Sequence, residues 1–132
     1  MNVKEFMKTY YAVSRYPSYG FRPTIRVMRP RIECNDGFTV SVQASEYHYC
    51  YPRDNAIQQG YTDVELGFPS EADELIDAYA EEPGEPTKTV YGCVPIDIVE
   101  KLVEKHGGIK GPEKEHADRI KEAGDKFTTC SW

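Results

Sequence analysis

The sequence predicts an α+β fold, in which a small antiparallel sheet of about four strands is flanked by an N-terminal helix and two or three C-terminal helices. Apolar residues recur with helical spacing at the start of the chain and again in its second half, but they alternate along several short segments between Thr24 and Val94. The turn sequence Asn35-Asp36-Gly37 separates two of the alternating segments. At 132 residues the chain fits one domain, which we expect to span residues 1–110.

The first elements should be a helix, a loop and a strand. The positions of Val3, Phe6, Met7, Tyr10 and Tyr11 predict an amphipathic helix from Val3 to Ser14, which Pro17 stops. Tyr16 to Pro23 has the composition of a loop. The strand that begins at Thr24 has Ile25 and Val27 on one face and Arg26 and Met28 on the other. Pro30 indicates that this strand is an edge strand or is bulged.

A hairpin should follow, because Asp-Gly supplies the positive φ angles of tight turns. It pairs Arg31–Cys34 with Phe38–Tyr49. On the second strand one face should enter the core, and the opposite face is polar throughout. The apolar face comprises Phe38, Val40, Val42 and Ala44, and the polar face comprises Thr39, Ser41, Gln43 and Ser45.

Two strands, two helices and a C-terminal segment are expected in the second half. Thr62 to Phe68 should be a strand with Val64, Leu66 and Phe68 inward, and Ser70 should cap a helix that ends near Glu82. Thr87 to Val94 should be the fourth strand, and Pro95 should open a helix that Gly107-Gly108 closes, with Ile96, Val99, Leu102 and Val103 inward. Residues 111–132 should form a polar C-terminal helix or tail. Its thin apolar stripe suits docking on a neighbouring protomer better than holding a core. A free tail is the alternative, and the aromatic residues Phe127 and Trp132 favour docking over it.

Charge and cysteine content narrow the class of protein. Met1 to Arg53 carry eight Lys or Arg and four Asp or Glu, whereas Asp54 to Trp132 carry eight and eighteen. The net charge of -6 argues against nucleic-acid binding, and no apolar run approaches the length of a membrane span. Four scattered cysteines and no visible signal peptide predict a cytoplasmic protein. His48 and Cys50 are the nearest approach to metal ligands, and we expect no metal or cofactor.

Catalytic motifs are absent from the sequence. It contains no nucleophile elbow, zinc-protease, phosphate-binding or dinucleotide-binding signature. Alternation on one strand would hold the side chains of His48 and Cys50 roughly 6–7 Å apart, too far for proton transfer. His106 is expected at a helix C-terminus, bonded to carbonyl groups. We therefore expect a protein that is not an enzyme.

The strongest chemical pattern interleaves arginines with aromatic residues. Guanidinium groups bind phosphate oxygens and stack on rings, and phenol rings offer flat faces to a base, so the pattern suits a nucleotide-like ligand. The alternative is that the arginines pair with the acidic second half and the tyrosines merely belong to the sheet. The residues concerned are Arg22, Arg26, Arg29, Arg31, Arg53, Tyr16, Tyr19, Phe21, Tyr47, Tyr49 and Tyr51.

Three segments carry a resemblance to a known group. The strings RIECNDGFTVSVQASEYHYCYPR, VELGFPSEADELIDAYAE and VYGCVPIDIVEKLVEKHGG resemble small proteins of phages and prophages of low-GC Gram-positive bacteria. In length and order of elements, Met1 to about Ile109 resembles the first type of anti-Thoeris sponge protein. That resemblance implies a phage protein that sequesters a cyclic ADP-ribose isomer, and in some relatives cyclic oligonucleotides, without degrading it. It also implies dimers that build hexamers.

The resemblance gives no residue-by-residue site, so the candidate ligand-binding residues come from chemistry. Arg22, Arg26 and Arg53 would contact phosphates, Tyr19 or Tyr91 would stack on the base, and Gln43 would bond a base edge or a ribose hydroxyl. Arg119 could enter a neighbour's pocket. Two other functions stay open. One is a phage inhibitor that binds a host protein, as anti-CRISPR proteins do, through the acidic surface from Glu71 to Glu85. The other is a small nucleotide-processing enzyme whose site forms between protomers.

Overall fold

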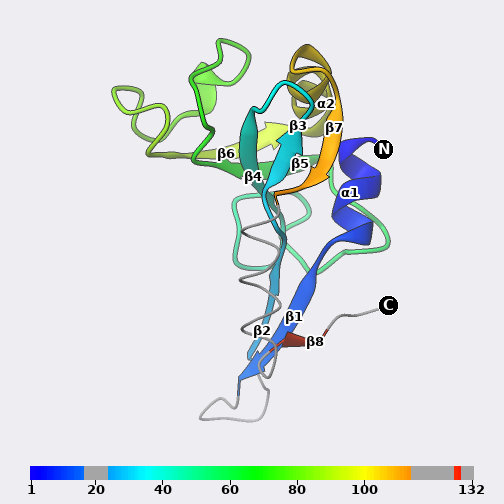
Figure 1. Ribbon diagram of the computed structural model, residues 1–132. Helices are drawn as coiled ribbons and strands as arrows, with labels where there is room; N and C mark the ends of the chain where they lie inside the picture. Colours follow the sequence, from blue (N-terminus) through cyan, green and yellow to red (C-terminus); the bar gives the residue numbers. More distant parts are fainter. Residues whose placement is uncertain (17–23, 114–126, 129–132) are drawn as a thin grey trace.

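The computed structural model describes residues 1–16, 24–113 and 127–128, and Figure 1 shows their arrangement. The fold is α+β, as the sequence predicts. An antiparallel sheet of five strands forms the body, one strand more than expected, and a second sheet has three strands. Two α-helices, α1 and α2, lie in the described part of the chain.

The predicted first helix is too long. The helix α1 spans Val3–Thr9, Asn2 caps it by accepting a hydrogen bond from the Glu5 N–H, and the chain is already extended at Tyr10. The next residues form the strand β1 (Ala12–Tyr16). Tyr10 and Tyr11 fit the last turn of a helix, but two such residues also fit the approach to a strand. The chain is extended here because β1 pairs with β2 in an antiparallel arrangement.

The second sheet has the strand order β2-β1-β8, with β2 at Thr24–Met28 and β8 at Phe127–Thr128. The strand β2 is therefore an edge strand, which confirms the prediction made from Pro30. Val27 is buried while Arg26 and Met28 are exposed, so the predicted faces of this strand are correct at these three residues. In Figure 1, β1 and β2 form a long ribbon that extends away from the five-stranded sheet.

The five-stranded sheet has the order β6-β5-β4-β3-β7 and is antiparallel throughout. The predicted hairpin turn is confirmed, because β3 and β4 pair around Gly37, whose φ is +97°. Its second strand was expected to reach Tyr49, and this is wrong, because β4 ends at Gln43. The fifth strand, β7, was not expected and crosses the predicted domain boundary after residue 110. The strands are β3 (Ile32–Cys34), β4 (Thr39–Gln43), β5 (Asp63–Gly67), β6 (Val90–Pro95) and β7 (Ile109–Pro112).

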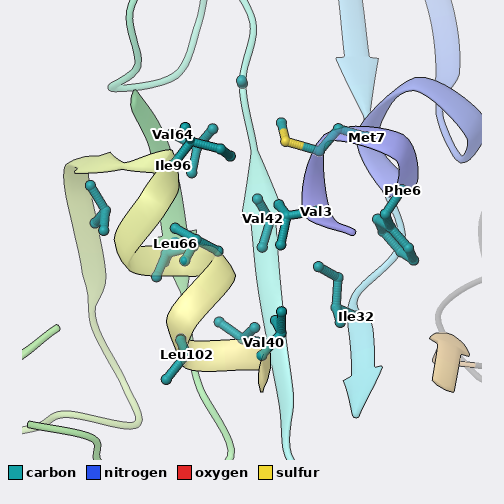
Figure 2. Close-up of a cluster of buried hydrophobic side chains, with 14 of the residues drawn as sticks. Val3, Phe6, Met7, Ile32, Val40, Val42, Val64, Leu66, Ile96 and Leu102 are labelled. Atoms are coloured by element: carbon teal, nitrogen blue, oxygen red, sulfur yellow. The ribbon is translucent and has the colours of Figure 1, made fainter. Parts of the chain in front are cut away.

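The core lies between this sheet and the two helices, as Figure 2 shows. The predicted apolar face of β4 is buried throughout, and α2 (Ile96–Lys105) buries all four residues expected to face inward. Its closure at Gly107 and Gly108, both with positive φ, is also confirmed. The prediction that Phe68 faces inward is wrong. Phe68 is 50% exposed, because the chain turns there at a φ of +50° and leaves the strand.

The predicted helix from Ser70 to Glu82 is wrong. The chain forms bends and a short 3-10 helix, η1 (Asp77–Tyr79), in its place. Ser70 caps no helix, because its hydroxyl accepts a hydrogen bond from the Thr39 N–H. The Asp73 carboxylate accepts one from the Leu75 N–H and also contacts His106 and Lys105, so tertiary contacts override the helical pattern.

His106 connects three parts of the domain. Its Nδ1 lies 2.7 Å from the Asp36 carboxylate on the hairpin turn, and its Nε2 lies 3.1 Å from that of Asp73. Its ring also stacks on Phe38, with 3.9 Å between the ring centroids. The expectation that this side chain bonds helix carbonyls is therefore wrong, since carboxylates from two loops take both ring nitrogens.

Candidate functional site

Two arginine–tyrosine pairs form the most concentrated part of the predicted aromatic and basic pattern within the described chain. The Arg26 guanidinium lies over the Tyr47 ring, 5.9 Å from its centroid, and that of Arg53 lies 5.3 Å from the Tyr49 centroid. We call these four residues the Arg–Tyr surface. Tyr47 and Tyr49 are about half exposed, at 51% and 50%, so part of each ring is open to a ligand. Cation–π contacts at such distances hold a guanidinium and a ring together.

A groove of about 320 Å³ lies beside the first pair. Its wall on β2 is formed by Arg26, Val27 and Met28, and its opposite wall by Ser45, Tyr47 and His48. The groove thus combines a cation, a flat ring, an imidazole and a short apolar strip. The cation can contact a phosphate, the flat ring can stack on a base, and the other groups can contact a ribose.

Internal hydrogen bonds fix the loop that follows β4 and carries three members of the surface. The Ser45 Oγ lies 2.6 Å from the His48 Nδ1 and accepts a hydrogen bond from the Tyr47 N–H. Further along, the Tyr49 N–H donates to Glu65, and the Arg53 Nε donates to the Glu46 carbonyl. The last bond brings Arg53 back beside the residue that precedes Tyr47, so Tyr47, Tyr49 and Arg53 belong to one folded loop, and Arg26 meets this loop from β2.

The same loop carries a serine–histidine contact, the arrangement found at many nucleophilic sites. Burial lowers the pKa of His48; the Glu65 carboxylate opposes this effect and the Arg29 cation adds to it. Ser45, however, is fully buried, and its hydroxyl already interacts with His48 and Tyr47. A substrate therefore cannot reach the serine oxygen in this conformation, and the contact holds the loop.

Cys50 does not lie on a shared strand face with His48, because β4 ends at Gln43. Its thiol donates to the Ser45 carbonyl, and burial raises its pKa. Among the residues that the structure describes, no group of three or more His, Cys, Asp or Glu side chains could hold a metal ion.

The predicted site residues separate into three sets. Arg26 and Arg53 lie on the Arg–Tyr surface. The side-chain amide of Gln43 is already hydrogen-bonded within the fold, since it accepts a hydrogen bond from the Arg29 N–H and donates one to the Arg29 carbonyl. Tyr91 is completely buried and donates its hydroxyl to the Pro86 carbonyl, so neither face of its ring is open for stacking.

Three other predicted residues, Tyr19, Arg22 and Arg119, lie outside the described residues, as does the expected C-terminal helix. The structure adds Tyr47, Tyr49 and His48 to the candidate site. The two tyrosines belong to the interleaved pattern in the sequence, but an expected strand as far as Tyr49 gave no sign that a loop would turn them toward arginines. The sequence singled out His48 only as a possible metal ligand or proton-transfer partner of Cys50, and nothing in it indicated a place beside a groove.

Comparison of the chain with protein-family models, with curated proteins and with solved structures found no match. Within the described residues, no helix has the length and apolar character needed to cross a membrane.

Proposed function

We propose that this chain is a phage-encoded anti-defence protein that binds a cyclic nucleotide immune signal and sequesters it without degrading it. The proposed ligand is a cyclic ADP-ribose isomer, with cyclic oligonucleotides as a related class, and the protein acts in the cytoplasm of the infected cell. The observation that carries the proposal is the Arg–Tyr surface, in which two guanidinium groups lie over two half-exposed rings and a groove lies beside the first of these pairs. Such a ligand presents phosphates and flat rings together.

Retention of the intact ligand is supported by the chemistry of the groove. Sequestration needs complementary contacts and no reacting group, and Ser45, which lines the groove in the described part of the chain, is buried and hydrogen-bonded. A homo-oligomer, either a dimer or a hexamer, forms part of the proposal. A second copy would cover the open side of a groove that a single chain leaves exposed.

The test is capture and release. Purified protein is incubated with cyclic ADP-ribose isomers or cyclic oligonucleotides, small molecules are removed by filtration, and the protein is heat-denatured. We expect the ligand to be depleted from the filtrate and recovered chemically intact after heating. Recovery of altered ligand would instead identify an enzyme, and absence of depletion would reject ligand binding.

A second candidate function is the inhibition of a host protein through an acidic surface, as anti-CRISPR proteins do. It is favoured by six carboxylate side chains that are all exposed on the segment after β5. If capture fails, pull-down of a nucleic-acid-binding host protein by the wild type, and its loss on charge removal, would support this function. The six exposed carboxylate residues of this acidic segment are Glu71, Glu74, Asp77, Glu81, Glu82 and Glu85.

A further inference from the structure

A second cavity, of about 330 Å³, lies between α1, the residue that follows β2, and the loop before β5. It shares no lining residue with the groove at Arg26. Figure 1 shows the loop before β5 passing beside α1. Its volume is at the small end of the range of about 300–1,000 Å³ that is usual for ligand sites. The residues on which the argument rests are Lys4, Met7, Lys8, Arg29, Ile57 and Tyr61.

Arg29 is the unusual member of this lining, because its side chain is completely buried. Its Nε donates to the Met7 carbonyl at 3.0 Å, and its Nη1 donates to the Ala44 carbonyl at 2.7 Å. Its Nη2 has no hydrogen-bond partner among the described residues. Buried donors are nearly always satisfied, so an unpaired guanidinium nitrogen at a cavity calls for a partner.

The charge of Arg29 is also uncompensated by its hydrogen bonds, because both acceptors are neutral carbonyls. Arginine stays protonated in proteins, and a buried charge is stable only when it is paired. Burial lowers the pKa of Arg29, and the nearby Tyr61 opposes that effect. Among the described residues that line the cavity there is no Asp or Glu, and the two charged residues besides Arg29 are Lys4 and Lys8.

The two lysines give the cavity a cationic rim. Lys4 and Lys8 are both exposed and stand one helical turn apart on α1, so they share a face of that helix. Met7, Ile57 and Tyr61 form the apolar part of the wall and are each at least 90% buried, and Gln59, Gly60 and Thr62 complete the lining. A ligand that fits must therefore place an anionic group near Arg29 and a small apolar or aromatic body between these walls.

We propose that this cavity binds a small organic anion, a carboxylate or a phosphate monoester, whose charged group is attracted by the buried Arg29 guanidinium in the cavity wall and whose apolar body lies against Met7, Ile57 and Tyr61. Lys4 and Lys8 attract the anion to the opening. This site shares no lining residue with the groove at Arg26, although both lie along the connection between β4 and β5. Arg29 then both joins α1 to the end of β4 and acts as the anion receptor.

The experiment uses benzoate and phenyl phosphate as probes, and benzamide as a neutral analogue of benzoate. The full chain labelled with ¹⁵N is titrated with each probe, and the Arg29 side-chain Nε–H signal is followed by NMR. We expect both anions to shift this signal saturably at millimolar concentration or below, and benzamide to leave it in place. An Arg29 Nε–H signal that does not shift on addition of either anion would overturn the proposal.

Variants test the same site without disturbing the core. The double substitution Lys4→Glu and Lys8→Glu should weaken anion binding about tenfold or more, because it reverses both rim charges at exposed positions. Lys88→Glu, an exposed charge reversal in a distant loop, is the matched control and should leave affinity unchanged. Arg53→Ala should also leave it unchanged, which separates this site from the Arg–Tyr surface. Equal affinity in the wild type and the double variant would contradict the proposal.

Discussion

Gln43 shows how a residue with ligand-binding chemistry can serve the fold. Its side-chain amide accepts from the Arg29 N–H at 3.0 Å and donates to the Arg29 carbonyl at 2.8 Å. It thereby pairs the backbone just beyond β2 with the face of β4. The sequence correctly placed Gln43 on the polar face of a strand. It could not show that this side chain would bond the backbone of Arg29, because the two residues are 14 positions apart and come together only in the fold.

Removal of this amide should cost stability. Gln43→Ala leaves the N–H and carbonyl of Arg29 without their partner, and we expect the free energy of unfolding to fall by about 1–3 kcal/mol. Urea unfolding measures this change, with the exposed Gln58→Ala as control. A loss of ligand capture without any loss of stability would contradict the structural role.

At the scale of elements, the His106 contacts hold the hairpin turn, the segment after β5 and the end of α2 together. Burial would raise the pKa of Asp73, but hydrogen bonds from the Leu75 N–H, Lys105 and His106 outweigh it, so the pKa lies below its usual value. The Phe38 N–H and His106 likewise lower the pKa of Asp36. Both aspartates therefore favour the folded state when they are ionised.

These shifts give a signed pH dependence. A carboxylate whose pKa is lower in the folded than in the unfolded state, where it is about 3.9, stabilises the fold above that value. Its contribution is lost as the pH falls through the folded-state pKa. We therefore expect the free energy of unfolding to decline as the pH falls below about 4.

The variant Asp73→Asn should lose about 1.5–3 kcal/mol at neutral pH and show a shallower decline in acid, because hydrogen bonds to a buried charged group are removed. Denaturant titrations from pH 7 to pH 2 measure both effects. Glu74→Gln, an exposed neighbour, should behave as the wild type. Parallel pH profiles of the wild type and Asp73→Asn would show that Asp73 does not contribute in this way.

The sequence predicted those elements that short-range patterns determine, and it failed where contacts between distant residues determine the structure. The hairpin at Gly37, the apolar face of β4 and the stripe of α2 follow from turn chemistry and periodicity, and all three are confirmed. The helix expected after Ser70 failed, because Asp73 bonds to residues more than thirty positions away. The strand β7 could not be recognised, since Ile109–Pro112 is short and contains a glycine and a proline.

At the scale of the whole molecule, the chain separates its charges. Arg26 lies on β2, within the ribbon that extends away from the body, whereas the acidic segment after β5 emerges elsewhere from the five-stranded sheet, as Figure 1 shows. Composition predicted a basic and aromatic first half. The pairing of Arg26 with Tyr47 and the burial of Arg29 could not be predicted, because both require the β1–β2 ribbon to meet the loop after β4.

The central claim is that the Arg–Tyr surface binds a cyclic nucleotide, and calorimetric titration with a cyclic ADP-ribose isomer tests it most directly. We expect saturable binding by the wild type. Arg26→Ala and Arg53→Ala should each weaken it by about 1.5–3 kcal/mol, or about tenfold to a hundredfold, because each removes a charged contact to a phosphate. Lys88→Ala should bind as the wild type does. Absence of binding, or unchanged affinity when both arginines are replaced in a variant that still folds, would contradict the account.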